Sequence, residues 1–387
     1  MVKKIVLTGG PCAGKTTALA KIEQDLISLG YKVFVVGESA TELIKSGVRP
    51  FGDKCLNLVE FQKIIMLYQL QKEEIYDKVL EQYTNDNVVI IYDRGILDNK
   101  AYINDEEFKE VLNYISYNKN KKIYEEDLLD RYDMIIHLVT AADGKKEAYT
   151  LNNNSTRTEG IEEAIRLDKK TMNAWIRHPN LKIIDNEKSF NTKIDNVMQK
   201  IYELLNNPIT LRTQLKFNVE LENYALEQIK KNSIPLDIEQ IYLKNNFYEE
   251  RIRKVTTDNN SIYYYTKQIK KENGESEVII NKRISHEEYN LLKNICEIED
   301  IIYKRRYTFI IDKQYYRLDE YDNYYILELE ITDKNKKINI PEGIHIKKDL
   351  TKKKTKISNY YWQLLIMCYN YNCERKVIIY GFNAKKF

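Results

Sequence analysis

Cysteine, proline and glycine are scarce in this chain. Its 387 residues include only 13 glycines, 6 prolines and 5 cysteines. So little glycine and proline excludes collagen-like repeats and linker-rich architecture. The odd number of cysteines and the lack of a C-x-x-C pair argue against a disulfide framework or zinc ribbon, and predict a reducing, cytoplasmic location.

Long apolar runs and a dominant charge are missing as well. No stretch approaches the roughly 18 apolar residues of a membrane helix, and the segment after MVKK is too short for a signal peptide. Lys and Arg total 61 against 58 Asp and Glu, a balance that is not typical of a nucleic-acid-binding protein. Hydrophobic residues make up 43%, which is enough for sizeable cores, and the length suggests two domains.

The first half alternates short apolar runs with helical patterns. The runs KKIVLTGG, KVFVVGE, NVVIIYDRG, DMIIHLVTA and LKIIDN read as buried strands. Helices are predicted between them, for example over residues 15–29 and 59–83, and a closing helix over residues 191–205. Strands that alternate with helices predict an α/β fold with a doubly wound parallel sheet.

The pattern changes to period two after about residue 205. Eight segments from QLKFNVE to YYILELEI read as strands, with one helix near residues 286–296 among them. This series predicts an antiparallel barrel or sandwich. We therefore expect two domains, residues 1–207 and 208–387.

One glycine-rich segment fits the phosphate-binding pattern G-x-x-x-x-G-K-[ST]. It follows a predicted strand and opens a predicted helix, which disfavours an ordinary glycine-rich turn. Lys15 would contact the β- and γ-phosphates, and Thr16 would hold Mg²⁺. The predicted nucleotide-binding residues are Gly9, Gly10, Pro11, Cys12, Ala13, Gly14, Lys15, Thr16 and Thr17.

Two carboxylates end neighbouring predicted strands. Asp93 lies where a P-loop enzyme needs a metal-binding carboxylate. Glu38 points to the same crevice and is either a base for an acceptor hydroxyl group or a residue that caps the next helix or faces solvent. In the polar segment after residue 140, Arg157 is our first choice for a catalytic arginine. Arg166 is the second, with a surface salt bridge as its alternative role. We expect His137 to be a core residue.

These features resemble the AAA-type P-loop proteins related to ribosylnicotinamide kinases and, more distantly, to deoxynucleoside kinases. The similarity lies in GGPCAGKTT, DRG, HLVTAADG, the R-T-E segment and AWIRHP…IIDN, over about residues 1–205. It implies a kinase-like domain that binds ATP or GTP with Mg²⁺. It does not fix the phosphoryl acceptor.

The predicted strands of the second half carry cations two residues apart, hence on one face of each strand. Arg251 and Arg253 form one such pair, and Lys304 and Arg306 another, while ELE supplies Glu328 and Glu330. Ordinary polar alternation is the alternative for any single pair. Turned inward in a barrel, the set would suit a polyphosphate and a divalent metal.

The order of these strands is similar to that of the CYTH, or triphosphate tunnel metalloenzyme, superfamily, over roughly residues 211–360. The resemblance implies an eight-stranded tunnel barrel with Mg²⁺ or Mn²⁺. It would assign phosphate binding to Lys216, Arg251, Arg253, Lys267, Arg283, Lys304 and Arg306, and metal binding to Asp319, Glu328 and Glu330. The family's Glu-x-Glu-x-Lys strand is altered here, because Arg212 and Gln214 stand where its two glutamates are expected.

Three hypotheses follow. The chain is a phosphotransferase that acts on a small, nucleoside-like hydroxyl acceptor; or it is a nucleotide-dependent switch whose barrel binds a polyphosphorylated ligand or phosphoinositide; or the barrel is a triphosphatase, which the missing glutamates disfavour. A lysine-rich segment at residues 347–356 reads as a solvated edge or tail. Contact with RNA or a membrane surface is its less favoured alternative.

Overall fold

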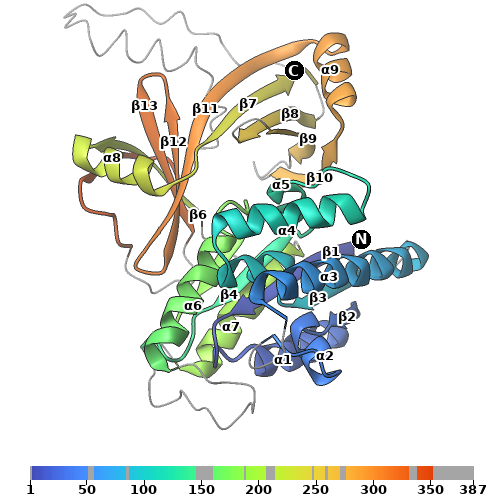
Figure 1. Ribbon diagram of the computed structural model, residues 1–387. Helices are drawn as coiled ribbons and strands as arrows, with labels where there is room; N and C mark the ends of the chain where they lie inside the picture. Colours follow the sequence, from blue (N-terminus) through green and yellow to red (C-terminus); the bar gives the residue numbers. More distant parts are fainter. Residues whose placement is uncertain are drawn as a thin grey trace, which may run out of the picture. The chain divides into compact units, whose positions relative to one another are not determined.

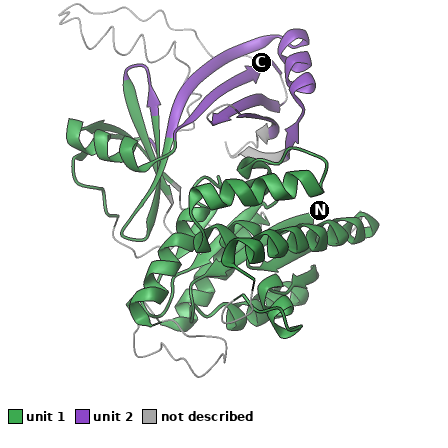
Figure 2. Cartoon of the chain, viewed as in Figure 1, with its two compact units in different colours: residues 1–234, 307–319, 324–349 green, residues 235–306, 320–323, 350–387 purple. Residues whose placement is uncertain are grey.

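The computed structural model describes residues 2–50, 56–83, 87–144, 160–186, 189–205, 214–245, 248–257, 260–270, 276–330 and 338–351. For a few strand residues, including Gln214 and Glu330, only the backbone is described. The described chain forms two compact units (Figure 2). The first contains residues 2–234, 307–319 and 324–349, and the second mainly residues 235–306 with 320–323.

A five-stranded parallel sheet forms the centre of the first unit (Figure 1). Its strand order is β2-β3-β1-β4-β5, and every neighbouring pair is parallel. The strands are β1 (Val2–Gly9), β2 (Lys32–Val36), β3 (Val88–Asp93), β4 (Met134–Leu138) and β5 (Leu181–Ile184). All five strands were predicted from their apolar runs.

Helices cover both faces of this sheet, because successive residues of a buried strand point to opposite sides. Ile5 and Leu7 pack in one hydrophobic cluster with α1 and α7, and Val6 packs in another with α3 and α4. This confirms the predicted doubly wound α/β domain. The helices are α1 (Lys15–Ser28), α2 (Ser39–Lys45), α3 (Leu58–Leu80), α4 (Asp105–Asn118), α5 (Glu125–Leu129), α6 (Ile161–Ala174) and α7 (Phe190–Leu204), with short 3-10 turns η1 (Glu81–Tyr83) and η2 (Ile96–Tyr102).

A second sheet has nine strands in the order β10-β9-β8-β7-β11-β12-β13-β6-β14. Eight were predicted, but β14 was not, because its residues were assigned to the lysine-rich segment. This order confirms a large antiparallel sheet among the described residues, and its closure into a barrel stays a prediction. The strands are β6 (Gln214–Leu221), β7 (Leu236–Leu243), β8 (Tyr248–Thr257), β9 (Asn260–Lys270), β10 (Ser276–Ile284), β11 (Ile298–Ile311), β12 (Gln314–Tyr321), β13 (Tyr324–Glu330) and β14 (Ile344–Asp349).

Two helices cover apolar parts of this sheet. Helix α8 (Asn223–Asn232) places Ile229 against a cluster that includes Phe217 and Leu327, and it was not predicted. Helix α9 (His286–Ile295) begins with a capping box and buries Tyr289 against Ile252. In the part of the chain that the structure describes, none of the helices has the length and apolar content needed to cross a membrane.

Candidate functional site

The phosphate-binding loop connects β1 to α1, in the position that the sequence predicts. Two of its glycines have positive φ angles, +146° at Gly9 and +89° at Gly14. A Cβ atom at Gly9 would lie 2.1 Å from the carbonyl oxygen of Leu138, and one at Gly14 would lie 2.4 Å from the ring of Phe190. Gly9 therefore needs glycine for conformation and for space, whereas Gly14 needs it for conformation, because the exposed ring of Phe190 can move.

A buried carboxylate that sequence analysis missed anchors the start of this loop. Asp168, on α6, accepts hydrogen bonds from the backbone N–H groups of Gly10 (2.7 Å) and Thr140 (3.1 Å). Its Oδ1 also lies 3.2 Å from Nε2 of His137, a fully buried residue as expected. Burial tends to raise the pKa of Asp168, but His137 and the two hydrogen bonds from backbone N–H groups outweigh it and lower the pKa.

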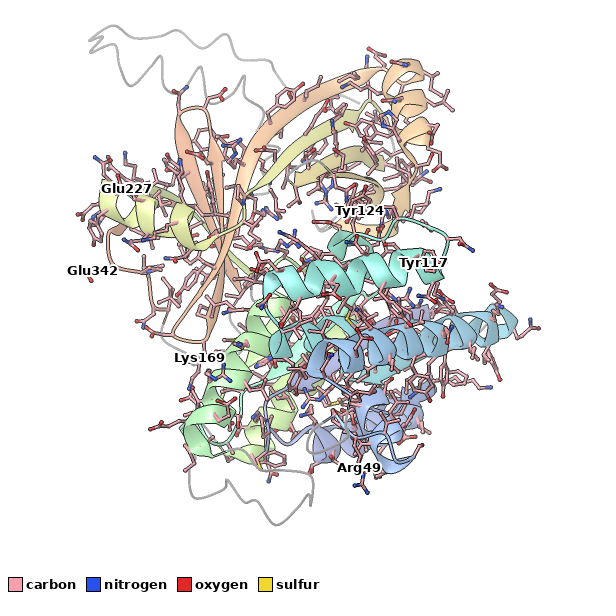
Figure 3. All side chains as sticks on the ribbon, viewed as in Figure 1. Arg49, Tyr117, Tyr124, Lys169, Glu227 and Glu342 are labelled. Atoms are coloured by element: carbon pink, nitrogen blue, oxygen red, sulfur yellow. The ribbon has the colours of Figure 1, made fainter. Side chains whose placement is uncertain are left out.

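Asp168 and Lys169, which follows it on α6, differ in exposure to solvent. Lys169 is exposed on the helix (Figure 3). Asp168, by contrast, is only 3% exposed. A Cβ atom at Gly10 would lie 2.6 Å from the Asp168 carboxylate. The second glycine of the loop is therefore required by the close approach of Asp168.

Lys15 begins α1 and turns its side chain back over the loop. Its ammonium group donates hydrogen bonds to the carbonyl oxygens of Gly9 (3.1 Å) and Gly10 (3.2 Å). Burial and the nearby Arg94 cation lower the pKa of Lys15 to about 8, although Glu38 and Asp93 act in the opposite direction. An ammonium group so poorly solvated favours an anionic partner.

Asp93 ends β3 beside Lys15. Burial raises its pKa, and Glu38 adds to this effect, whereas Lys15 and Arg94 oppose it. Its Oδ1 atom is buried and has no hydrogen-bond partner among the described residues. A buried, unpartnered carboxylate oxygen fits a divalent cation, and the exposed Thr16 in the first turn of α1 offers the hydroxyl group of the predicted pair.

Glu38 lies immediately before α2, where its carboxylate pairs with a cation that our site prediction omitted. Oε1 is 2.5 Å from Nε of Arg94, and Oε2 accepts a hydrogen bond from the hydroxyl group of Thr41 at 2.6 Å. Burial tends to raise the pKa of Glu38, but Arg94, Thr41 and Lys15 together lower it. Glu38 is therefore an anion at neutral pH.

Arg94 belongs to the DRG segment, and its backbone is left-handed, with φ at 69°. Its Nη1 atom lies 3.4 Å from Oδ2 of Asp98, which also accepts hydrogen bonds from Thr8 (2.5 Å) and, through Oδ1, from Trp175 (2.6 Å). Both carboxylate oxygens of Asp98 thus have protein partners, and Asp98 orients Arg94. The strand-end position of DRG was the available sequence signal for Arg94.

The two predicted arginines of the polar segment differ in outcome. Arg157 lies outside the described residues. Arg166 forms an exposed ion pair with Glu163 on the same helix, with Nε to Oε2 at 2.7 Å, which is the surface role given as its alternative.

Five predicted cations of the second unit share one face of its sheet. In the strand register, Arg251 and Arg253 lie opposite Thr266 and Tyr264. Tyr264 in turn lies opposite Arg283 on β10. Through β7, the same face continues to Lys304 and Arg306 on β11. The register thus gathers Arg251, Arg253, Arg283, Lys304 and Arg306.

Lys267 is separated from this set. It lies opposite Glu250 in the register, and its ammonium group pairs with that carboxylate at 3.2 Å. Because adjacent residues of a strand point to opposite faces, Lys267 shares the face of Tyr265 and not that of Arg251. The expectation that Lys267 joins the other cations is therefore corrected.

The predicted carboxylates lie in the other compact unit. Glu328 on β13 is opposite Lys216 in the register and pairs with it at 3.1 Å, and Arg317, which was not predicted, approaches the same carboxylate at 3.5 Å. Asp319 is fully buried, and the side chain of Glu330 is outside the described atoms. No cluster of three metal-binding side chains occurs within the described ranges.

Comparisons with known proteins agree with the geometry of the first unit. A family model of the AAA domain matches residues 4–193, just under half of the chain. A thymidylate kinase from Mycoplasma capricolum is 28% identical over 100 residues, which make up 25% of this chain and 46% of that kinase. The chain thus spans less than half of this relative. Together with the loop geometry, these matches support a P-loop, kinase-like nucleotide-binding domain.

Solved structures resemble part of this chain only distantly. One is the inorganic triphosphatase NE1496, with a TM-score of 0.27 and 17% identity over 38% of this chain and 90% of that chain. Another is the PH1012 protein from Pyrococcus horikoshii OT3, with a TM-score of 0.24 and 18% identity over 32% and 80%. At such TM-scores the likeness carries no argument about this chain.

Proposed function

We propose that this chain is an Mg²⁺-dependent phosphotransferase that moves the terminal phosphoryl group of ATP or GTP to a small hydroxyl acceptor. The observation that carries the proposal is the Glu38–Arg94 pair beside Lys15 and Asp93. The sheet order β2-β3-β1 sets the three segments that follow these strands side by side. Ligands of open α/β sheets bind at such strand ends.

Each residue has a defined task in this proposal. Lys15 binds the β- and γ-phosphates, and Arg157 adds positive charge to the transferring group. Asp93 and Thr16 would hold Mg²⁺, which neutralises phosphate charge when it is bound. The unpartnered oxygen of Asp93 supports this assignment.

Glu38 receives the proton of the acceptor hydroxyl group. Its lowered pKa keeps it ionised, and Arg94 fixes one oxygen while Thr41 donates to the other. A hydroxyl group that binds this carboxylate would be oriented toward the nucleotide phosphates. We therefore expect Arg94 to be a positioning residue for the base.

The test is acceptor-stimulated turnover. Because one relative is a thymidylate kinase, nucleosides and nucleoside monophosphates are the first acceptors to try. Purified protein would be incubated with ATP or GTP, Mg²⁺ and one acceptor at a time, and the products would be identified by mass spectrometry. Formation of a phosphorylated acceptor supports the proposal, whereas turnover that no acceptor accelerates contradicts it.

A second candidate function concerns the cationic face of the second unit. Five cations on one face favour a polyphosphorylated ligand, because charged hydrogen bonds to phosphate are strong. We propose that this region binds such a ligand and that the protein is switched by nucleotide. We expect little triphosphatase activity, because Arg212 and Gln214 replace the family's first-strand glutamates. Titration calorimetry with tripolyphosphate tests binding, and phosphate release tests hydrolysis.

A further inference from the structure

The hairpin between β11 and β12 belongs to the first compact unit together with the α/β domain (Figure 2). Its turn residues, Asp312 and Lys313, both have positive φ angles, 48° and 61°. Beyond the turn, Tyr315 is 8% exposed and joins the same hydrophobic cluster as Trp175. Its hydroxyl group donates a hydrogen bond to the carbonyl oxygen of Ile176 at 3.0 Å. The hairpin is thus anchored in the core of the nucleotide-binding domain.

The turn of this hairpin also makes an ion pair with the segment after β4. The ammonium group of Lys313 lies 3.0 Å from the carboxylate of Asp143, and both side chains are 30% exposed. The backbone of Asp143 is held from the other side, because its carbonyl oxygen accepts a hydrogen bond from Nδ2 of Asn186 at 3.0 Å.

Asn186 connects Asp143 to the phosphate loop through a hydrogen bond with Lys193. Its Oδ1 atom accepts a hydrogen bond at 2.7 Å from Lys193, which is 5% exposed at the start of α7. The Lys193 ammonium group also donates to the carbonyl oxygens of Val139 (2.8 Å) and Ala13 (3.0 Å). Ala13 lies in the phosphate loop, immediately before Gly14.

These hydrogen bonds fix the orientation of the Ala13 carbonyl group in the phosphate loop. When the carbonyl oxygen of Ala13 is bound to Lys193, it is held on the side of α7 and cannot turn toward a phosphate. A buried ammonium group with three acceptors is a strong anchor, since hydrogen bonds to charged groups exceed neutral ones. Burial lowers the pKa of Lys193 to about 8, and Lys313 adds to this effect.

We infer that Lys193 is a positioning residue of the phosphate loop and that Lys313, on the β11–β12 hairpin, supports it through Asp143 and Asn186. Nucleotide affinity then depends on residues that the nucleotide does not touch. One of them lies more than one hundred positions along the chain from the others. The inference rests on nucleotide binding by the P-loop, which the experiment measures first.

The experiment uses the full chain and titrates a fluorescent ATP analogue with Mg²⁺. Lys193→Met keeps most of the side-chain volume and removes the donor, and we expect at least a tenfold rise in Kd. Lys313→Ala and Asp143→Ala each remove one side of a half-exposed pair, and we expect about a threefold rise in Kd from either. The variant that combines Lys313→Ala with Asp143→Ala should have a Kd no higher than that of either single variant, because both substitutions remove the same ion pair.

The matched control is Lys244→Ala, which removes an exposed ion pair with Glu297 at 2.6 Å in the other compact unit. Its Kd should equal that of the wild type. The charge reversal Lys313→Asp with Asp143→Lys should return Kd to within about twofold of the wild type, because it restores the pair. The melting temperature of each nucleotide-free variant separates positioning from stability, since a merely structural role would change it without changing Kd.

Two outcomes would overturn the inference. One is a wild-type Kd in Lys193→Met or, if that variant does not fold, in both Lys313→Ala and Asp143→Ala. The other is a loss of affinity that the charge reversal does not restore. If the wild-type protein itself bound no nucleotide, the proposed function would fail instead, so the two failures are distinguishable.

Discussion

The guanidinium group of Arg94 lies 2.5 Å from the carboxylate of Glu38, and the two residues come from different strand ends, after β2 and β3. The pair joins a proposed base to the DRG segment that also contains Asp93. It keeps Glu38 ionised and restricts its rotation. Both effects matter for a carboxylate that must accept one proton at a fixed position.

Glu38→Gln should therefore slow transfer more than it weakens nucleotide binding. An amide keeps the shape but cannot take the proton, and we expect acceptor-dependent kcat to fall by at least about 10²-fold. Nucleotide Kd should change by less than about threefold. Glu42→Gln is the control, because that carboxylate lies on α2, which begins directly after Glu38, and pairs with Lys72 at 2.5 Å. Equal losses in kcat and affinity would indicate a structural role for Glu38.

Lys15→Ala should abolish turnover without unfolding the protein. Loss of a phosphate-binding charge costs at least about 10²-fold in rate. Because burial lowers the pKa of Lys15, its ammonium group is poorly solvated in the nucleotide-free protein, and its removal should leave the melting temperature equal or higher. Steady-state kinetics and thermal unfolding measure the two effects. Undiminished turnover would refute the assignment of the loop.

Gly10→Ala should weaken both folding and nucleotide binding. The new methyl group would lie 2.6 Å from an Asp168 oxygen and 2.8 Å from its Cβ, so α6 or the loop has to move. Overpacking of this kind costs roughly 1–3 kcal/mol in the free energy of unfolding. Urea unfolding measures this cost. Gly160→Ala would test glycine loss alone, because a Cβ there meets no atom within 4 Å and its φ is −68°.

Stability should fall below neutral pH because of His178. Its Nε2 lies 2.9 Å from the carbonyl oxygen of Tyr132, and its Nδ1 accepts from the N–H of Asn180, so the ring is held neutral. Burial lowers its pKa from 6.5 to about 4. Between pH 6.5 and about 4, His178 therefore binds a proton in the unfolded chain but not in the folded protein. The stability that the neutral ring contributes above pH 6.5 is lost as the pH falls through this range. From pH 7 to 5 we expect a loss of about 2 kcal/mol, which His178→Gln should remove in urea titrations. An unchanged pH dependence in that variant would contradict the assignment.

The cationic face can be tested with a control that the strand register provides. In a Lys15→Ala background, which disables the P-loop, tripolyphosphate should raise the melting temperature. Adding Arg251→Ala and Arg306→Ala should remove the shift. Adding Lys267→Ala should preserve it, because Lys267 lies on the opposite face. If Lys267→Ala changed the melting-temperature shift as much as Arg251→Ala with Arg306→Ala, the ligand would not bind this face.

The parts of the fold that depend on local pattern were predictable from the sequence. The parallel strands follow from apolar runs, and the loop around Lys15 follows from glycine spacing between a strand and a helix. Strand ends also located Glu38 and Asp93. Each of these inferences uses residues that are close together in the chain.

Contacts between distant segments were not predictable in the same way. Asp168 and Lys193 look like ordinary polar residues of amphipathic helices, and only the packing of α6 and α7 brings them to the phosphate loop. Period two places Lys267 on the face of Tyr263 and Tyr265, but the register that sets this face opposite Glu250 and apart from Arg251 could not be obtained from the sequence. Strand β14 was missed because its lysines suggested an exposed tail, whereas it pairs with β6.

The fourteen-residue strand β11 contributes to both compact units, which divide between Arg306 and Tyr307. A recombinant fragment that ends near residue 207 would therefore lose the ring of Tyr315 from its own core and leave the carbonyl oxygen of Ile176 without its partner. We expect such a fragment to aggregate more readily than the full chain. Exchange of either half alone for that of another protein would therefore separate Tyr315 from the apolar cluster that it completes.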